Sequence, residues 1–330
     1  MIAEDTIRRQ LTRTLEATRL NGFGERYQGK VRDCYIDRAA GRRVIVATDR
    51  ISAFDRVLGT VPFKGQVLNQ LSAWWFRKGG AVAPNHVIAV PDPQVTVARE
   101  CAPLRVEIIV RAYMAGVTTT SIWYNYERGV RDFCGNQLPE GLRKNEPLPN
   151  PIITPTTKAE HGGHDHNASR AELVAEGWVS AEDFDAAAGM ALALFAMGQR
   201  WAASRGLILA DTKYELGRNG AGELVFIDEI HTPDSSRYWH ADDYAERLRR
   251  GEEPRGLDKE YVRRWFVDRG YRGEGTPPRF EDQVRVEAAR RYIEVFELLT
   301  GESFVADESA PEERIRRNLT AAAFRTSPAA

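Results

Sequence analysis

Two strand-like segments joined by a glycine-rich turn constrain the fold of this chain more than any other feature. Residues 207–215 begin with an apolar run and end in alternating charged side chains, and residues 223–230 form a second, largely apolar segment. The stretch between them, 217–222, holds three glycines, which is typical of a turn between antiparallel strands. We therefore expect a hairpin whose second strand is too apolar to lie at an exposed edge.

The charged residues of this hairpin predict a metal site. Strand side chains alternate between the two faces, so Asp211, Lys213 and Glu215 should share one face. If the turn closes over 220–222, Glu215 lies opposite Asp228, with side chains about 5 Å apart. Two carboxylates at that distance repel by roughly a few kcal/mol, and a divalent cation removes the repulsion. A small number of oxygen ligands favours Mg²⁺, which binds nucleotide phosphates alongside one or two carboxylates. The alternative is that these charged residues simply form a solvated face of a surface hairpin.

Composition narrows the class of protein. The chain has 330 residues, 42% of them hydrophobic and 28% charged, which fits roughly two folded domains at about 150 residues each. The net charge of -1 provides no bulk attraction to nucleic acid or to an anionic membrane. Three widely spaced cysteines without a C-x-x-C motif argue against disulfides or a cysteine zinc site. Without a secretory signal or a membrane-spanning run, we expect a cytoplasmic protein.

The remaining patterns favour an α+β fold over regular strand–helix alternation. Strands are expected at 30–37, 43–47, 87–90 and 106–111, the first two as a hairpin, and helices at 7–15, 68–76, 258–269 and 281–299. Ser180 should cap a long helix that ends near residue 205. Residues 134–167, rich in Pro, Gly and Asn, are interpreted as a surface excursion. A domain boundary near Pro103 divides the chain into 1–104 and 105–330.

Three further segments carry candidate chemistry. Gly29, Lys30 and Arg32 could cover nucleotide phosphates, although the segment is neither a Walker loop nor a dinucleotide fingerprint. The loop 231–239 offers hydroxyl and guanidinium donors for an anion, unless Asp234 and Arg237 merely pair to hold a turn. Three histidines crowd one loop without a fourth ligand at a suitable spacing, so we expect no metal there: His161, His164 and His166.

Taken together, these segments resemble the phosphoribosylaminoimidazole-succinocarboxamide synthase (SAICAR synthetase) family. The matching motifs lie in the family's order at 29–33, 48–55, 106–111, 154–160, 211–215 and 228–239. The resemblance implies an ATP-dependent ligase of purine biosynthesis, which joins the carboxylate of carboxyaminoimidazole ribonucleotide (CAIR) to the amine of L-aspartate through an acyl phosphate. It also implies a two-lobed, ATP-grasp-like fold with the nucleotide between the lobes, and extra helices at the C-terminal end.

The resemblance implies roles on the nucleotide side of the site. Gly29, Lys30 and Arg32 should lie along the ATP phosphates. Glu215 and Asp228 should hold Mg²⁺. These five residues are the expected cofactor-binding set, with ATP and Mg²⁺ as the ligands.

The resemblance also implies roles on the substrate side. Lys213 should bridge phosphate and substrate carboxylate, with Asp211 and Asp234 as acids that organise the catalytic group. The expected substrate contacts are Arg111, Ser235, Ser236 and Arg237 for the CAIR phosphate, and Lys158 and Asp165 on the CAIR and aspartate side. The partners are thus small molecules, without nucleic acid or membrane.

Two departures from the family pattern and two rival functions remain. The family usually has Gly-Ser after the arginine strand, but Gly116 is followed here by Val117, so Thr118, Thr119 or Thr120 could take over. The common Glu-Phe-Gly is Glu-Leu-Gly at 215–217, a conservative change. The rivals are another ATP-dependent phosphotransferase or ligase, and a nucleotide-binding regulatory protein. The paired acids and the lysine argue against the second.

Overall fold

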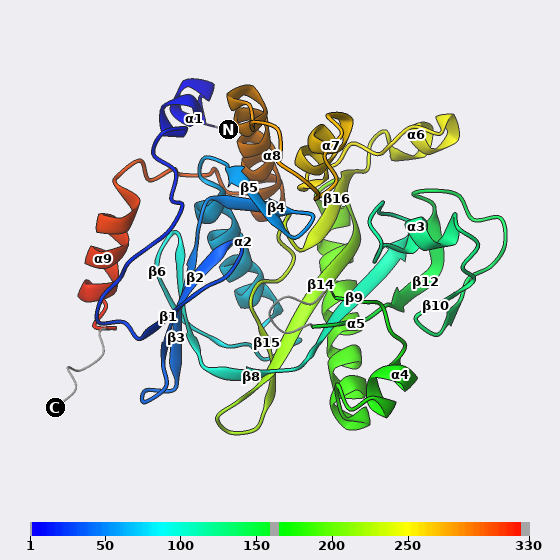
Figure 1. Cartoon of the computed structure of the whole chain (residues 1–330), viewed down its shortest axis with the longest axis horizontal. Coiled ribbons are helices and arrows are strands. Elements are labelled where there is room, and N and C mark those ends of the chain that lie inside the picture. Colours follow the sequence, from blue (N-terminus) through cyan, green and yellow to red (C-terminus); the bar gives the residue numbers. More distant parts are fainter. Residues whose placement is uncertain (1, 159–164, 325–330) are drawn as a thin grey trace.

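The computed structural model describes residues 2–158 and 165–324, which form two large antiparallel sheets with helices packed around them (Figure 1). The first sheet has the strand order β1-β2-β3-β7-β6. Its strands are β1 (Glu25–Gln28), β2 (Arg32–Asp37), β3 (Arg42–Ala47), β6 (Val87–Asp92) and β7 (Val95–Arg99). A separate hairpin follows β3 in the chain and consists of β4 (Arg50–Ala53) and β5 (Arg56–Thr60).

The second sheet is built on two long central strands, β9 and β14. Its path is β12-β9-β14-β15, with β13 paired to β9, and β8 and β16 paired to β14. The strands are β8 (Cys101–Pro103), β9 (Val106–Tyr113), β12 (Pro147–Ile153), β13 (Thr156–Thr157), β14 (Leu207–Asn219), β15 (Leu224–Ile227) and β16 (Ser236–His240). A minor hairpin joins β10 (Asp132–Phe133) to β11 (Asn136–Gln137).

The helices cover both sheets. They are α1 (Glu4–Gln10), α2 (Lys64–Gly79), α3 (Ile122–Tyr126), α4 (Arg170–Ala175), α5 (Ala181–Ser204), α6 (Tyr244–Arg250), α7 (Glu260–Asp268), α8 (Asp282–Thr300) and α9 (Pro311–Ala321). In Figure 1, α5 runs behind β9 and β14, and both strands contact it. No helix in the described part of the chain is long and apolar enough to cross a bilayer. The predicted α+β class is confirmed.

The helix predicted after Ser180 is confirmed, together with its cap. The Ser180 hydroxyl accepts a hydrogen bond from the Asp183 amide at 3.0 Å, which satisfies one of the free amides at the helix start. Along α5, Phe184, Ala191 and Phe195 are buried and belong to one large core that also includes residues of α2, α8, β9 and β14. This packing gives the second sheet a rigid back, and its charged residues emerge on the other side.

The C-terminal helices return to the N-terminal part of the molecule. Helix α8 contacts α1 and α2, and α9 contacts β6 (Figure 1). The Arg314 guanidinium, fully buried, pairs with the buried Asp92 carboxylate at 2.9 Å and donates to Gln94 at 2.6 Å. Since a buried charge without a partner is strongly unfavourable, this pair fixes α9 on the turn between β6 and β7. The division of the chain at residue 104 stays a prediction.

The predicted hairpin of β14 and β15 is present, but its predicted register is wrong. Glu215 lies opposite Ile227, not opposite Asp228. The turn closes over 220–222 as expected, with the Asn219 amide bonded to the Glu223 carbonyl and the Asn219 side chain accepting hydrogen bonds from the amides of Ala221 and Glu223. Counted back from this closure, Glu215 meets Ile227, one residue short of Asp228. A slip of one residue moves a strand side chain to the other face. This alternation does not apply to Asp228, because Asp228 follows the strand and has a left-handed backbone conformation, with φ of 66°.

The interpretation of 134–167 as a surface excursion is wrong for part of its length. Strand β12 pairs with β9 through Ile152 opposite Arg111, and β13 pairs with β9 through Thr156 opposite Glu107. Prolines at 147, 149 and 151 disguise β12. They are tolerated because β12 is an edge strand with an irregular register, where a missing amide donor costs little.

Candidate functional site

The charged face of β14 meets a buried carboxylate from β9. The Lys213 ammonium group lies 2.7 Å from the Glu107 carboxylate and 2.9 Å from that of Glu215. Burial by itself lowers the pKa of Lys213, but the two carboxylates raise it well above its ordinary value. Lys213 is therefore a permanent cation at the centre of this face, as the strand alternation predicts.

Glu215 and Asp228 occupy the same region despite the changed register. Glu215 also forms an ion pair with Lys158. Burial alone raises the pKa of Glu215, but Lys213 and Lys158 lower it overall. For Asp228, burial raises the pKa, Arg32 lowers it and Glu215 raises it again, and the net shift is upward. The mutual effect on these carboxyl groups is the repulsion that the sequence predicts.

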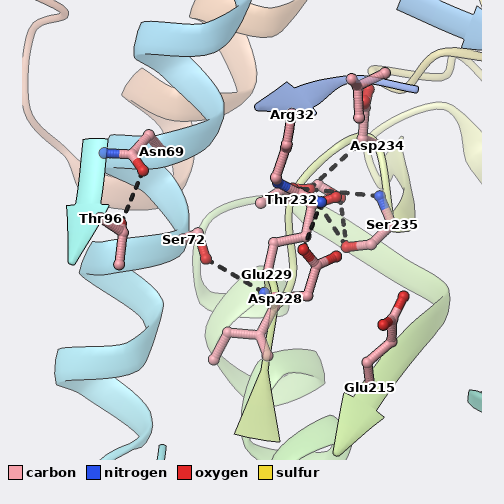
Figure 2. Close-up of polar contacts among 12 residues, drawn as sticks. Arg32, Asn69, Ser72, Thr96, Glu215, Asp228, Glu229, Thr232, Asp234 and Ser235 are labelled. Atoms are coloured by element: carbon pink, nitrogen blue, oxygen red, sulfur yellow. Dashed lines mark hydrogen bonds and ion pairs between the residues drawn. The ribbon is translucent and has the colours of Figure 1, made fainter. Parts of the chain in front are cut away.

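Arg32 links the first sheet to these acids. Its guanidinium group lies 2.5 Å from the Asp228 carboxylate and 2.9 Å from that of Glu229. Figure 2 shows Arg32 above Asp228 and Glu229 at the end of β15, with Glu215 rising from β14. We call Glu107, Glu215, Asp228 and Glu229 the carboxylate cluster. It gathers acids from two strands, β9 and β14, and from the segment that follows β15, around one arginine and two lysines.

A cavity of about 980 Å³, the main cavity, opens over the carboxylate cluster. It is lined by all five residues of the predicted nucleotide and metal set, and also by Lys158, Asp165 and Lys213. Lys30 stands apart from Arg32: its ammonium group pairs with the Asp55 carboxylate at 2.6 Å, and both side chains are more than half exposed. Lys30 is thus at a solvent-exposed part of the cavity wall, and Arg32 is in its interior.

A smaller cavity of about 200 Å³, the arginine cavity, lies beside Arg111 and Arg237. The Arg111 guanidinium lies 3.1 Å from the Asp211 carboxylate, and Arg237 pairs with the same oxygen. Ser235 and Ser236 line the cavity as well. Two guanidinium groups that share one carboxylate keep a surplus positive charge, which suits a dianionic phosphate.

Asp234 does not pair with Arg237, so the alternative in which this pair merely holds a turn is wrong. Instead, Asp234 lies 2.7 Å from the fully buried Lys64 ammonium group and accepts a hydrogen bond from the Tyr292 hydroxyl at 2.5 Å. Burial raises the pKa of Asp234, but Lys64 and Lys259 lower it overall. Asp234 is an ionised carboxylate held from both sides.

The two cavities adjoin each other. Four residues line both of them, namely Lys213, Asp234, Ser235 and Lys259. A ligand anchored by the arginine pair can therefore reach the main cavity along a path bounded by charged side chains.

Val117 stands where the family usually has a serine, and hydroxyl groups of residues that follow it line the arginine cavity instead. Val117 is 43% exposed and does not line the arginine cavity, whereas Thr118, Thr120 and Ser121 do. The hydroxyls of Thr118 and Ser121 are 2.8 Å apart. Gly116 has a φ of 92°, and a β-carbon there would lie 2.4 Å from the Ser121 hydroxyl and 2.9 Å from Arg237, so Gly116 allows both groups to approach.

Sequence reasoning missed four residues of the site. Glu107 and Ser121 carried a usable signal, because Glu107 interrupts an apolar strand and Ser121 precedes a helix near the predicted phosphate site. Lys64 and Lys259 carried none, since each meets the site only through tertiary packing. The missed residues are Lys64, Glu107, Ser121 and Lys259.

The described residues contain no group of three or more His, Cys, Asp or Glu side chains arranged to hold a metal ion. The carboxylates of Glu215 and Asp228 offer two ligands at most, which fits Mg²⁺ bound mainly through water and phosphate. Of the three loop histidines, His161 and His164 lie outside the described residues. The His166 ring lies 3.0 Å from the Thr157 hydroxyl, beside β13.

Comparison with known proteins agrees with this geometry. The SAICAR synthetase family model matches residues 25–279. The phosphoribosylaminoimidazole-succinocarboxamide synthase of Legionella pneumophila (strain Lens) is 50% identical over 301 residues, which cover 90% of this chain and 95% of the relative. The chloroplastic synthase of Arabidopsis thaliana is 45% identical over 325 residues, covering 96% of this chain and 78% of the relative.

A solved structure of the SAICAR synthase of Saccharomyces cerevisiae, complexed with SAICAR, shares the fold. It superposes with a TM-score of 0.74 and 28% identity, and the match covers 89% of this chain and all of the other. The matched region contains both sheets and the residues that line the two cavities. The chain therefore belongs to the SAICAR synthetase family.

Proposed function

We propose that this protein joins the carboxylate of CAIR to the amine of L-aspartate, with ATP converted to ADP and phosphate, in purine biosynthesis. The observation that carries the proposal is that the carboxylate cluster and the arginine pair lie in two adjoining cavities, both lined by Lys213. A ribonucleotide whose phosphate lies on Arg111 and Arg237 can present its carboxylate to a nucleotide in the main cavity. The names of the most similar relatives support the same activity.

The chemistry needs an activated carboxylate, because a free carboxylate is a poor acylating agent. A carboxylate oxygen attacks the γ-phosphorus; the new P–O bond forms as the bond to the β-phosphate oxygen breaks, and ADP leaves. The aspartate amine then attacks the carbonyl carbon, the C–O bond to phosphate breaks, and the nitrogen loses a proton. Lys213 lies where negative charge accumulates in both steps, so its contribution is electrostatic and positional.

The residues present fit a bound Mg²⁺. Glu215 and Asp228 would hold the ion, and Glu215 raises the pKa of the buried Asp228, a repulsion that a cation relieves. When bound, the ion would neutralise charge on the ATP phosphates. Arg32 already neutralises Asp228 and Glu229 in part, and Lys158 does so for Glu215. These ion pairs hold the acids in place until ligands bind.

The proposal includes the finer architecture. We take the first sheet as the nucleotide-covering lobe, at 1–104, and the second sheet with the helical tail as the other lobe, at 105–330, in an ATP-grasp-like arrangement. The position of the main cavity between Arg32 of β2 and Glu215 of β14 supports this division. The cytoplasmic location stays a prediction.

Substrate dependence tests the proposed reaction. ADP release by the purified protein should require CAIR and L-aspartate together with ATP and Mg²⁺, and the product should have the mass of SAICAR. ADP that appears equally fast without aspartate would show that the protein is another phosphotransferase. Omission of each substrate in turn is the matched control.

The metal site has its own test. Glu215→Ala and Asp228→Ala should each abolish Mg²⁺-dependent turnover while the circular dichroism spectrum stays that of the unmodified protein. Glu100→Ala is a matched control, since Glu100 pairs with Arg43 at 2.8 Å and does not line either cavity. Unchanged turnover in both site variants would refute the role of these two acids.

A further inference from the structure

Lys259 lies where the main cavity and the arginine cavity meet, just before α7. Its backbone amide donates to the Pro233 carbonyl at 3.4 Å, and the Leu257 amide donates to the Tyr238 carbonyl at 2.9 Å. These main-chain hydrogen bonds hold Lys259 over the turn that contains Asp234. The backbone of Lys259 is thus held beside this turn, and Lys259 lines both cavities.

The other charged side chains at this junction are already engaged. Lys213 is balanced by two carboxylates, those of Glu107 and Glu215. Both oxygens of Asp234 are taken, one by Lys64 and one by a tyrosine hydroxyl. In contrast, the Lys259 ammonium group forms no ion pair with a carboxylate in the described part of the chain.

The electrostatic surroundings of Lys259 favour an incoming anion. Burial lowers the pKa of its ammonium group, Asp234 raises it, Arg263 and Lys64 lower it, and Glu229 raises it; the net shift is downward. A lowered pKa means that the positive charge is incompletely compensated. An anionic ligand beside this group would restore the balance and keep Lys259 protonated.

The proposed reaction requires such a charge at this place. A carboxylate that approaches the γ-phosphate brings two anions together, and Lys213 already shares its charge with two acids, so a second cation strengthens the neutralisation. With its phosphate in the arginine cavity, a ribonucleotide whose carboxylate reaches the main cavity lies along the shared wall that includes Lys259. We propose that the Lys259 ammonium group binds the ribonucleotide carboxylate and holds it for phosphorylation. This inference rests on the proposed ligase function.

Lys259 acts here by charge alone. It stays protonated while the carboxylate oxygen attacks the γ-phosphorus and while the amine later displaces phosphate. It therefore neither gives nor takes a proton in either step. Its effect should appear in the affinity for CAIR and in the rate of phosphorylation, and not in the affinity for ATP.

Steady-state kinetics of Lys259→Met and Lys259→Arg test the assignment. The methionine variant should raise the KM for CAIR about tenfold and lower kcat about 10²-fold, because a charge-assisted contact to the reacting group is lost. The KM for ATP should change by less than about threefold. The arginine variant should recover a large part of the activity. Arg264→Met is the matched control, since Arg264 lies on α7, the helix that Lys259 precedes, is 51% exposed and lines neither cavity.

The pH dependence of kcat/KM for CAIR distinguishes a role of the Lys259 charge from a purely structural role. In the unmodified protein, kcat/KM for CAIR should fall at alkaline pH as Lys259 loses its proton. In Lys259→Arg the fall should move to higher pH, because a guanidinium group stays protonated to above about pH 12. The charged groups facing Lys259 are the same in both proteins: Lys64, Glu229, Asp234 and Arg263.

Each outcome decides between the two proposals. If the unmodified protein does not form SAICAR, the proposed function is wrong. If it does, but Lys259→Met matches Arg264→Met, the assignment of Lys259 is overturned. A change confined to the KM for ATP would also overturn it. Should Lys259→Met fail to fold, as judged by circular dichroism, an alkaline limb that is the same in Lys259→Arg and the unmodified protein would contradict the assignment.

Discussion

The main cavity and the arginine cavity are both lined by charged side chains, but they balance those charges differently. In the main cavity, the four acids of the carboxylate cluster face three cations, namely Arg32, Lys158 and Lys213. In the arginine cavity, Arg111 and Arg237 share the single carboxylate of Asp211. The carboxylate cluster therefore keeps a surplus of negative charge that suits a cation, and the pair of Arg111 and Arg237 keeps a surplus of positive charge that suits a phosphate.

Removing the ammonium group of Lys213 from the main cavity should have the largest effect on activity. In Lys213→Met, Glu107 and Glu215 lose the ammonium group that they share, and charge in the transition state is no longer neutralised. We expect kcat to fall about 10³-fold, measured as SAICAR formation at saturating substrates. Lys78→Met is the control, because that ammonium group lies 4.0 Å from the Trp201 ring centroid and outside both cavities. Equal kcat values in the two variants would refute a central role for Lys213.

Removing one guanidinium from each region tests their division of labour. Arg237→Met should raise the KM for CAIR about 10²-fold, because a bidentate contact to phosphate is lost. Arg32→Met should instead raise the KM for ATP. If both variants changed the same KM, the two cavities would not hold different substrates.

Asp258 provides a smaller test, because it lies beside Arg237 without bonding to it. Burial raises the pKa of Asp258 to about 6, although Arg237 lowers it. The folded protein therefore takes up a proton more readily than the unfolded chain, whose aspartates titrate near pH 3.9. The free energy of unfolding contributed by this group decreases as pH rises through about 6 and is constant above that value.

The variant Asp258→Asn should remove this loss of stability. The free energy of unfolding in urea should be measured for the variant and for the unmodified protein at both pH values. The difference, variant minus unmodified protein, should be about 1 kcal/mol larger at pH 8 than at pH 5. Asp185→Asn is the control without such a pH-dependent difference, since a hydrogen bond from Arg170 lowers the pKa of that exposed carboxyl group, which is therefore ionised at both pH values in the folded and the unfolded chain. A difference that is the same at both pH values would show that Asp258 does not titrate in this range.

The smallest effect is expected at the edge of the arginine cavity. Val117→Ser restores the residue usual in the family, but Val117 points outside this cavity and the hydroxyls of Thr118 and Ser121 already line it. The KM for CAIR should change by less than about threefold. Ser121→Ala should raise it more. The reverse order would mean that Val117 occupies the phosphate site after all.

Much of the architecture could be predicted because it depends on local signals. Ser180 marks the start of α5, and the alternating charges of β14 place Lys213 and Glu215 on one face. Those features follow from capping and from the two-residue period of a strand. They need no knowledge of the rest of the chain.

The errors have different causes. The register of β14 and β15 is set by closure of the turn at Asn219 and Glu223, a pair of positions that the glycines of 217–222 do not specify to a single residue. Strand β12 is hidden by prolines that only an edge position tolerates. Lys64 and Lys259 lie in segments far along the chain from the motifs of the site. Composition and local pattern therefore do not predict that these two lysines contact it.

The salt bridge of Arg314 with Asp92 spans 222 residues of chain. On the ribosome, the strands of the first sheet emerge early, but Asp92 lacks its cation until Arg314 has been synthesised, 222 residues later. A nascent N-terminal fragment must therefore leave that acid hydrated or protonated, with the sheet edge open. Docking of α9 therefore closes a sheet whose strands were synthesised long before it.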